Sequence, residues 1–141
     1  MEDLKKYIGI PYGFNESSFE AADCAGLVSL FYREHGWPDD YPKPKTKDWY
    51  MKEPLYMQKY LMKNFSMTRD IDELTYGDIL YYQINGEGHI GVYLNYGKFL
   101  STYPKVSEFN GGCSFIDRCR FWFNMGGVKF IAGFRRKTGD N

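Results

Sequence analysis

Apolar residues recur at helical spacing in one early segment of the chain. This apolar stripe consists of Leu27, Val28, Leu30 and Phe31. Asp23 precedes the stripe and is of a residue type that caps helix N-termini, while Gly36-Trp37-Pro38 is a typical helix stop. The pattern therefore predicts an amphipathic helix that begins after Asp23 and ends at Gly36. A shorter helical turn is expected at residues 4–8, and a short helix at residues 55–64.

After Gly77-Asp78 the pattern changes to short apolar runs that are separated by turn residues. These runs predict four strands, at residues 79–84, 89–94, 99–103 and 128–134. Residues 85–88 form the first expected turn, and Gly97 lies in the second. A helix followed by an antiparallel sheet predicts an α+β fold, with residues 1–141 as one domain.

The amino-acid composition and charge exclude several classes of function. The 18 basic and 18 acidic residues give a formal net charge of zero, which argues against nucleic-acid binding. The one dense basic run, residues 135–137, is interpreted as a solvated tail. No apolar stretch approaches the length of about 18 residues that a membrane span needs. The first residues lack the apolar core of a signal peptide, so we expect a cytoplasmic or virion-associated protein.

Cys24 occupies the position in the chain that best suits a nucleophile. It lies in the first turn of the predicted helix, where unpaired main-chain N–H groups stabilise a thiolate. The same N–H groups are able to donate to an oxyanion on an attacked carbonyl. The small residues Ala25 and Gly26 allow the helix to approach its neighbours closely. The alternative interpretation is that Cys24, Cys113 and Cys119 are simply small buried apolar residues.

A cysteine nucleophile needs a base, and the chain has only two histidines. His35 lies in the last turn of the Cys24 helix, too far away to reach the thiol, and is interpreted as a favourable C-terminal cation. His89 follows a glycine-rich turn and opens a predicted strand, where it is placed to meet a helix N-terminus. His89 is therefore the candidate base, against the alternative of a surface histidine.

The third member of such a site depends on the length of the turn around Gly97. With a three-residue loop and Gly97 in the left-handed conformation, Gly91 lies opposite Ser101, and Ser101 points to the His89 face. A two- or four-residue loop presents Leu100 and Thr102 instead. Ser101 is thus a conditional candidate for the residue that orients the imidazole, against a plain surface serine.

Four segments together resemble the NlpC-type family of cell-wall cysteine peptidases. In chain order they are Tyr7-Ile8-Gly9-Ile10-Pro11-Tyr12, Asp23-Cys24-Ala25-Gly26-Leu27-Val28, Gly77-Asp78-Ile79-Leu80 and His89-Ile90-Gly91-Val92-Tyr93-Leu94. The resemblance implies a papain-like fold, in which the nucleophile helix packs on a central antiparallel sheet. It also implies Cys24 as nucleophile, His89 as base, and Tyr12 and Asp23 near the oxyanion and substrate.

The family resemblance also implies a substrate and the absence of a cofactor. The expected substrate is the stem peptide of bacterial peptidoglycan, with no metal or other cofactor. The missing signal peptide, the compact single domain and the aromatic residues favour a phage setting, with tail proteins as further partners, over an enzyme that recycles wall peptides. The chain departs from the family pattern at Ala25, where serine is common, and at Ser101, where histidine is common.

Three other functions compete with this interpretation. The first is a catalytically weak member of the same fold that serves as a structural tail or assembly component, since serine is a weak orienting residue. The second is a zinc-binding module built from Cys24, His89, Cys113 and Cys119, although Cys113 and Cys119 are spaced more widely than zinc ligands usually are. The third is an acyltransferase, which would pass through the same acyl-enzyme.

Overall fold

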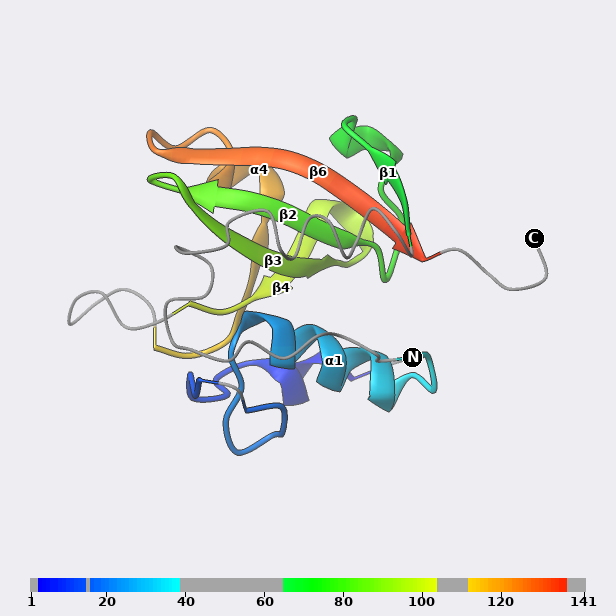
Figure 1. The fold of residues 1–141 in the computed structure, drawn as a ribbon, viewed down its shortest axis with the longest axis vertical. Coiled ribbons are helices and arrows are strands. Elements are labelled where there is room, and N and C mark those ends of the chain that lie inside the picture. Colours follow the sequence, from blue (N-terminus) through cyan, green and yellow to red (C-terminus); the bar gives the residue numbers. More distant parts are fainter. Residues whose placement is uncertain (1–2, 15, 39–64, 104–111, 137–141) are drawn as a thin grey trace.

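A six-stranded antiparallel sheet organises the protein. The computed structural model describes residues 3–14, 16–38, 65–103 and 112–136. In spatial order the strands are β1 (Phe65–Thr68), β6 (Val128–Arg136), β2 (Ile79–Ile84), β3 (Glu87–Tyr93), β4 (Lys98–Ser101) and β5 (Phe115–Arg118). Helix α1 (Cys24–Glu34) lies along one face of this sheet, against β3 and β4 (Figure 1). The expected α+β fold, with the nucleophile helix packed on an antiparallel sheet, is confirmed.

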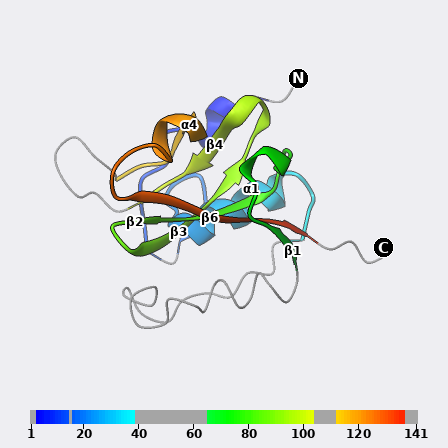
Figure 2. The same ribbon diagram turned by 90° about the horizontal axis from the view of Figure 1, so that it is seen from above.

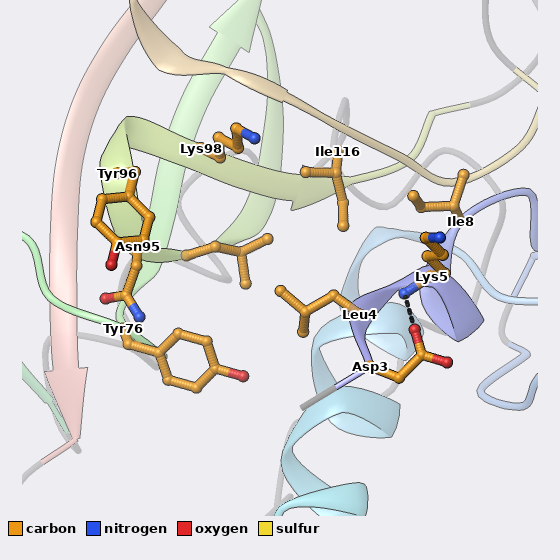
Figure 3. A pocket seen from close by; sticks show the side chains of 10 residues that line it. Asp3, Leu4, Lys5, Ile8, Tyr76, Asn95, Tyr96, Lys98 and Ile116 are labelled. Atoms are coloured by element: carbon orange, nitrogen blue, oxygen red, sulfur yellow. Dashed lines mark hydrogen bonds between the residues drawn. The ribbon is translucent and has the colours of Figure 1, made fainter. Parts of the chain in front are cut away.

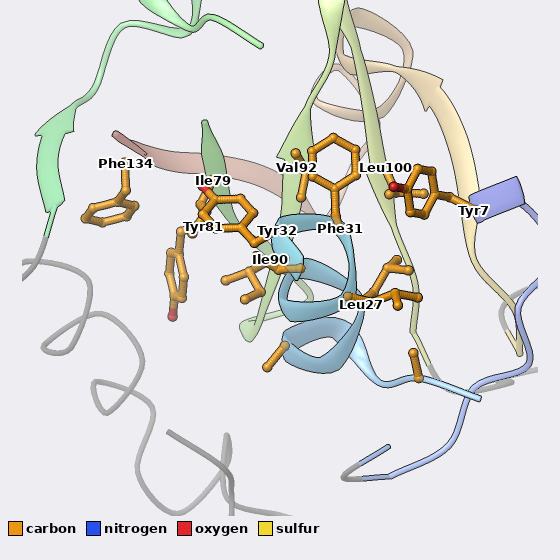
Figure 4. Packing of buried hydrophobic residues seen from close by; sticks show 14 of the residues in the cluster. Tyr7, Leu27, Phe31, Tyr32, Ile79, Tyr81, Ile90, Val92, Leu100 and Phe134 are labelled. Atoms are coloured by element: carbon orange, nitrogen blue, oxygen red, sulfur yellow. The ribbon is translucent and has the colours of Figure 1, made fainter. Parts of the chain in front are cut away.

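Each face of the sheet has its own apolar core, because side chains alternate between the faces along each strand. The core under α1 joins the helix stripe to alternate strand residues, including Leu27, Phe31, Ile90, Val92 and Leu100 (Figure 4). The opposite face is covered by the short helix α4 (Cys119–Trp122), whose place is seen in Figure 2. The core on this face is rich in aromatic rings. Its buried members are Leu74, Leu80, Tyr82, Phe99 and Cys119.

The predicted helix after Asp23 is confirmed. The Asp23 carboxylate accepts a hydrogen bond of 2.7 Å from the main-chain N–H of Gly26, which caps the first turn. At the other end His35 is the C-cap residue, and Gly36 has a φ of 73°. The His35 ring nitrogen Nδ1 lies 2.7 Å from the Phe31 carbonyl oxygen, so this histidine satisfies the helix end as a cap.

The hairpin of β2 and β3 is longer than the sequence suggested. Asn85 and Gly86 both have positive φ values, 51° and 87°, and form a two-residue turn. Strand β3 therefore begins at Glu87, and His89 is its third residue, paired with Tyr82 across the hairpin. The expectation that His89 opens its strand was wrong, because the Asn-Gly turn lets the ladder continue through Glu87 and Gly88.

The turn between β3 and β4 has the length on which the Ser101 prediction depended. Asn95–Gly97 form a short 3-10 turn (η3), and Gly97 has a φ of 72°. The resulting register places Gly91 opposite Ser101 and Tyr93 opposite Phe99. A side chain at position 91 would come within 2.6 Å of the Leu100 carbonyl oxygen, so only glycine allows β4 to lie this close.

Several elements were not expected from the sequence. They are the short strands β1 and β5 and helix α4, while the first helical turn is the 3-10 helix η1 (Leu4–Tyr7). The basic run also differs from its interpretation as a tail, because β6 extends to Arg136 and Arg135 binds Asp78. The helix predicted for residues 55–64 lies outside the described residues. Nowhere in the described ranges is there a helix with the length and hydropathy of a membrane span.

Candidate active site

Cys24 is the first residue of α1 and lies where the helix meets the sheet. The main-chain N–H groups of Ile90, Ala25 and Cys24 itself are within hydrogen-bonding reach of the thiol, and each favours its ionised form. Ile90 directly follows His89 on β3. The contact with Ile90 therefore brings the predicted nucleophile to the part of the sheet that carries the predicted base.

Burial outweighs these favourable contacts at the thiol. Desolvation raises the pKa of Cys24 from 9.0 to about 12, and the neighbouring Asp23 carboxylate adds to this rise. The residue as a whole still keeps partial exposure to solvent. The main-chain N–H groups at the helix start favour a thiolate, as the sequence suggested, but packing of the sheet against the helix removes water from the sulfur and raises the pKa of the thiol on balance.

His89 is also held in its neutral form. The residue is only 7% exposed, and burial lowers the pKa of the imidazole from 6.5 to about 4. The Tyr82 ring stacks on it with centroids 5.6 Å apart, and the Tyr103 ring lies at 6.3 Å with its plane nearly perpendicular. A neutral imidazole has a free nitrogen lone pair, so His89 is able to accept a proton at neutral pH.

Ser101 lies on the His89 face of the sheet and is completely buried. Its hydroxyl donates a hydrogen bond of 2.9 Å to the Ile90 carbonyl and lies 2.6 Å from the Tyr82 hydroxyl. Because Ser101 has a single hydroxyl proton, the Tyr82 hydroxyl is the donor of the second bond. One acceptor position on Ser101 remains for a donor such as the imidazole N–H, and a direct bond from His89 stays a prediction.

Tyr12 and Asp23 lie on the segments that lead into the nucleophile. Tyr12 bridges in parallel to Ala22, two residues before Cys24, and its main-chain N–H donates to the Gly112 carbonyl at 2.9 Å. Asp23 is buried and caps the helix through Gly26, so its visible role is to hold the first turn of α1. Direct contact of either side chain with a substrate stays a prediction.

A profile of the NlpC/P60 family matches residues 9–113, which is well over half of the chain. This chain belongs to the NlpC/P60 family. A search among curated proteins found no match. The matched region contains Cys24, His89 and Ser101, so the site described above lies wholly inside the NlpC/P60 region.

Solved structures show the same fold. NlpC1 from Trichomonas vaginalis is 19% identical, with a TM-score of 0.62 over 94% of this chain and 40% of that protein. An NlpC/P60 family protein from Bacillus cereus is 20% identical, with a TM-score of 0.59 over 94% of this chain and 37% of that protein. The P60 domain of a Mycobacterium avium subspecies paratuberculosis antigen is 16% identical, with a TM-score of 0.55 over 94% of this chain and 87% of that domain.

Two facts follow from these comparisons. The present chain spans about two fifths of the length of the NlpC proteins that it resembles, so its likeness to them concerns one part of each. The similar structures named above come from Trichomonas vaginalis and from bacteria, and they give no support to the phage setting that was expected from the sequence.

Gly26 explains why the NlpC/P60 nucleophile motif of this chain contains small residues. A side chain at this position would collide with the main-chain carbonyl of Glu16, which crosses the start of α1. The hydroxyl of Ser17 in turn donates to the Gly26 carbonyl at 2.8 Å. The expected close approach of the helix start is thus confirmed for Gly26, and residues 16–17 are the neighbours that sequence reasoning did not identify.

The Gly77-Asp78 motif anchors the far side of the sheet. The buried Asp78 carboxylate accepts the Thr75 main-chain N–H at 2.8 Å and two Arg135 nitrogen atoms at 2.9 and 3.1 Å. Gly77 has a φ of 92°, which favours glycine, and its position packs against the Trp37 ring. The motif therefore joins β2 to β6 and supports the strand that carries Tyr82.

The four residues of the zinc alternative do not converge. Cys113 is exposed, Cys119 is buried in the core on the face that α4 covers, away from α1 and Cys24, and neither forms a disulfide. In the described ranges, no group of three or more Cys, His, Asp or Glu side chains is arranged to hold a metal ion.

A separate groove of about 910 Å³ lies between η1 and the β3–β4 turn (Figure 3). Its lining includes Leu4, Ile8, Tyr76, Tyr96 and Ile116, and it contains neither Cys24 nor His89. The groove is therefore distinct from the candidate active site.

Proposed function

We propose that the protein is a cysteine endopeptidase or amidase that hydrolyses stem peptides of bacterial peptidoglycan. The observation that carries this proposal is the contact between the Cys24 thiol and the main-chain N–H of Ile90, next to His89. Membership in the NlpC/P60 family supports a cell-wall substrate. Cys24 is the nucleophile, His89 is the base, and Ser101 helps to orient the imidazole.

The reaction begins with both groups neutral. His89 takes the thiol proton as the sulfur attacks the substrate carbonyl carbon, and the negative charge moves to the carbonyl oxygen. Because burial disfavours a free thiolate, proton transfer accompanies the attack instead of preceding it. The main-chain N–H groups of Cys24 and Ala25 at the start of α1 are the proposed donors for the oxyanion, with Tyr12 as a further candidate.

The remaining steps return the enzyme to its starting state. The protonated His89 gives its proton to the leaving amine as the C–N bond breaks, which leaves a thioester on Cys24. His89 then takes a proton from water, whose oxygen attacks the thioester carbonyl. The C–S bond breaks, the thiolate recovers the proton, and a carboxylic acid is released.

The test is digestion of purified peptidoglycan with the wild-type chain, followed by mass identification of the new amino and carboxyl termini. Cys24→Ala and His89→Ala should each reduce hydrolysis to background while both variants stay folded, since nucleophile and base act as one unit. Cys113→Ser is the matched control, because this thiol is exposed and lies outside the site. If Cys24→Ala digests the wall at the wild-type rate, the proposal is wrong.

A catalytically weak member of the family is the second candidate. It is favoured by one observation, namely that burial raises the pKa of the Cys24 thiol and so disfavours the reactive thiolate. The same digestion separates the two proposals. Wild-type protein that releases no more termini than Cys24→Ala supports the structural role, whereas a clear excess supports the enzyme.

A further inference from the structure

Tyr82 lies against the candidate base in a way that the sequence did not reveal. It is opposite His89 in the β2–β3 register, and its side chain is 0% exposed. The two rings are nearly parallel, with 25° between their planes and 5.6 Å between their centroids. The phenol ring therefore forms one wall of the space in which the imidazole is able to turn.

The Tyr82 hydroxyl extends this contact into a buried chain of hydrogen bonds. It donates to Ser101 Oγ at 2.6 Å, and Ser101 donates to the Ile90 carbonyl at 2.9 Å. Ile90 follows His89 in the chain, and its N–H contacts the Cys24 thiol. One network thus fixes both the ring beside the imidazole and the main chain beside the sulfur.

This arrangement suits a site whose third residue is a serine. A serine side chain is short and has a single hydroxyl proton. Ser101 donates this proton to the Ile90 carbonyl. Ser101 is thus able to act toward the imidazole only as an acceptor, and Tyr82, which stacks on His89, is the aromatic neighbour whose hydroxyl holds Ser101. Burial raises the pKa of Tyr82 far above its ordinary value, so the phenol remains a neutral donor.

We propose that Tyr82 is a positioning residue for His89, with its ring holding the imidazole plane and its hydroxyl holding Ser101 and the Ile90 main chain in place. The effect of Tyr82 on hydrolysis rests on the proposed function. Its effect on the Cys24 thiol, however, is measurable without any wall substrate, because His89 also assists removal of the thiol proton during alkylation.

The experiment compares Tyr82→Phe, which keeps the ring, with Tyr82→Leu, which removes it. Tyr93→Phe is the matched control, because Tyr93 lies on the same face and its hydroxyl binds the Gly97 N–H at 3.1 Å, at the far end of the hairpin. Alkylation of Cys24 by iodoacetamide is followed at near-neutral pH by peptide mass spectrometry. His89→Ala sets the rate without a base.

We expect Tyr82→Phe to slow Cys24 alkylation about tenfold and Tyr82→Leu to approach the rate of His89→Ala. Tyr93→Phe should react at the wild-type rate even where its thermal stability falls. On a defined stem peptide, Tyr82→Phe should lower kcat about tenfold and leave KM unchanged, since the phenol is buried away from substrate.

The result that would overturn the inference is a folded Tyr82→Phe variant with the alkylation rate and kcat of wild type. If Tyr82→Leu fails to fold, Tyr82→Phe decides alone, because it keeps the ring and the volume of the site. If the wild type does not hydrolyse peptidoglycan but alkylation follows the expected order, the proposed function fails and the positioning role of Tyr82 stands.

Discussion

Replacing His89 with glutamine removes the buried imidazole and should change how stability depends on pH. In the folded protein burial lowers the pKa of His89 from 6.5 to about 4. As the pH falls below 6.5, His89 becomes protonated in the unfolded chain, whereas in the folded protein it stays neutral until the pH nears 4. The wild type therefore has this stabilisation above pH 6.5 and loses it progressively as the pH falls toward 4.

The size of the effect follows from the same shift. A fall from 6.5 to about 4 corresponds in full to about 3 kcal/mol, and about 2 kcal/mol of this is lost between pH 7 and pH 4.5. In the His89→Gln variant, the free energy of unfolding should lack this part of its pH dependence. All other ionisable groups are present in both proteins, so their contribution cancels in the comparison.

The assay is urea unfolding of both proteins at several pH values between 7 and 4.5, followed by the fluorescence of the three tryptophans. The two curves of unfolding free energy against pH should diverge by about 2 kcal/mol at the acid end. Parallel curves would refute the reasoning, because they would mean that the imidazole is not buried in its neutral form. The acid limb of kcat/KM on a stem peptide should likewise lie nearer pH 4 than 6.5.

Four other substitutions test different contacts. Ser101→Ala should slow hydrolysis of a defined stem peptide about ten- to a hundredfold. Thr102→Val should leave this rate unchanged and raise the free energy of unfolding by about 1 kcal/mol, because the buried Thr102 hydroxyl has no partner among the described atoms. If Thr102→Val slows hydrolysis and Ser101→Ala does not, the orienting residue must be reassigned. Gly26→Ala should destabilise by about 3 kcal/mol in urea unfolding, since its side chain meets the Glu16 carbonyl, and an unchanged midpoint would contradict this. Asp78→Ala should cost about 2 to 3 kcal/mol, and a wild-type melting temperature would exclude the proposed anchor.

The sequence by itself determined the features that depend on neighbouring residues. The cap at Asp23, the apolar stripe after it and the stop at Gly36 specify α1, because helix ends and faces are local properties. The turn around Gly97 restricted the register to a choice between Ser101 and its neighbours Leu100 and Thr102, because loop length sets the pairing of a hairpin, and only the structure decided for Ser101. The ordered motifs around Cys24 and His89 likewise indicated the family.

The tertiary structure alone decided the properties that depend on distant parts of the chain. Burial of Cys24 and His89 is the sum of contacts from helix and sheet, so its effect on the pKa of the thiol and of the imidazole has no local signal in the sequence. The link from Tyr82 to Ser101 crosses two strand pairings and has no local pattern. The edge strands β1 and β5 are four residues each, too short for a periodic signal, and they form because β6 and β4 offer open hydrogen-bonding edges.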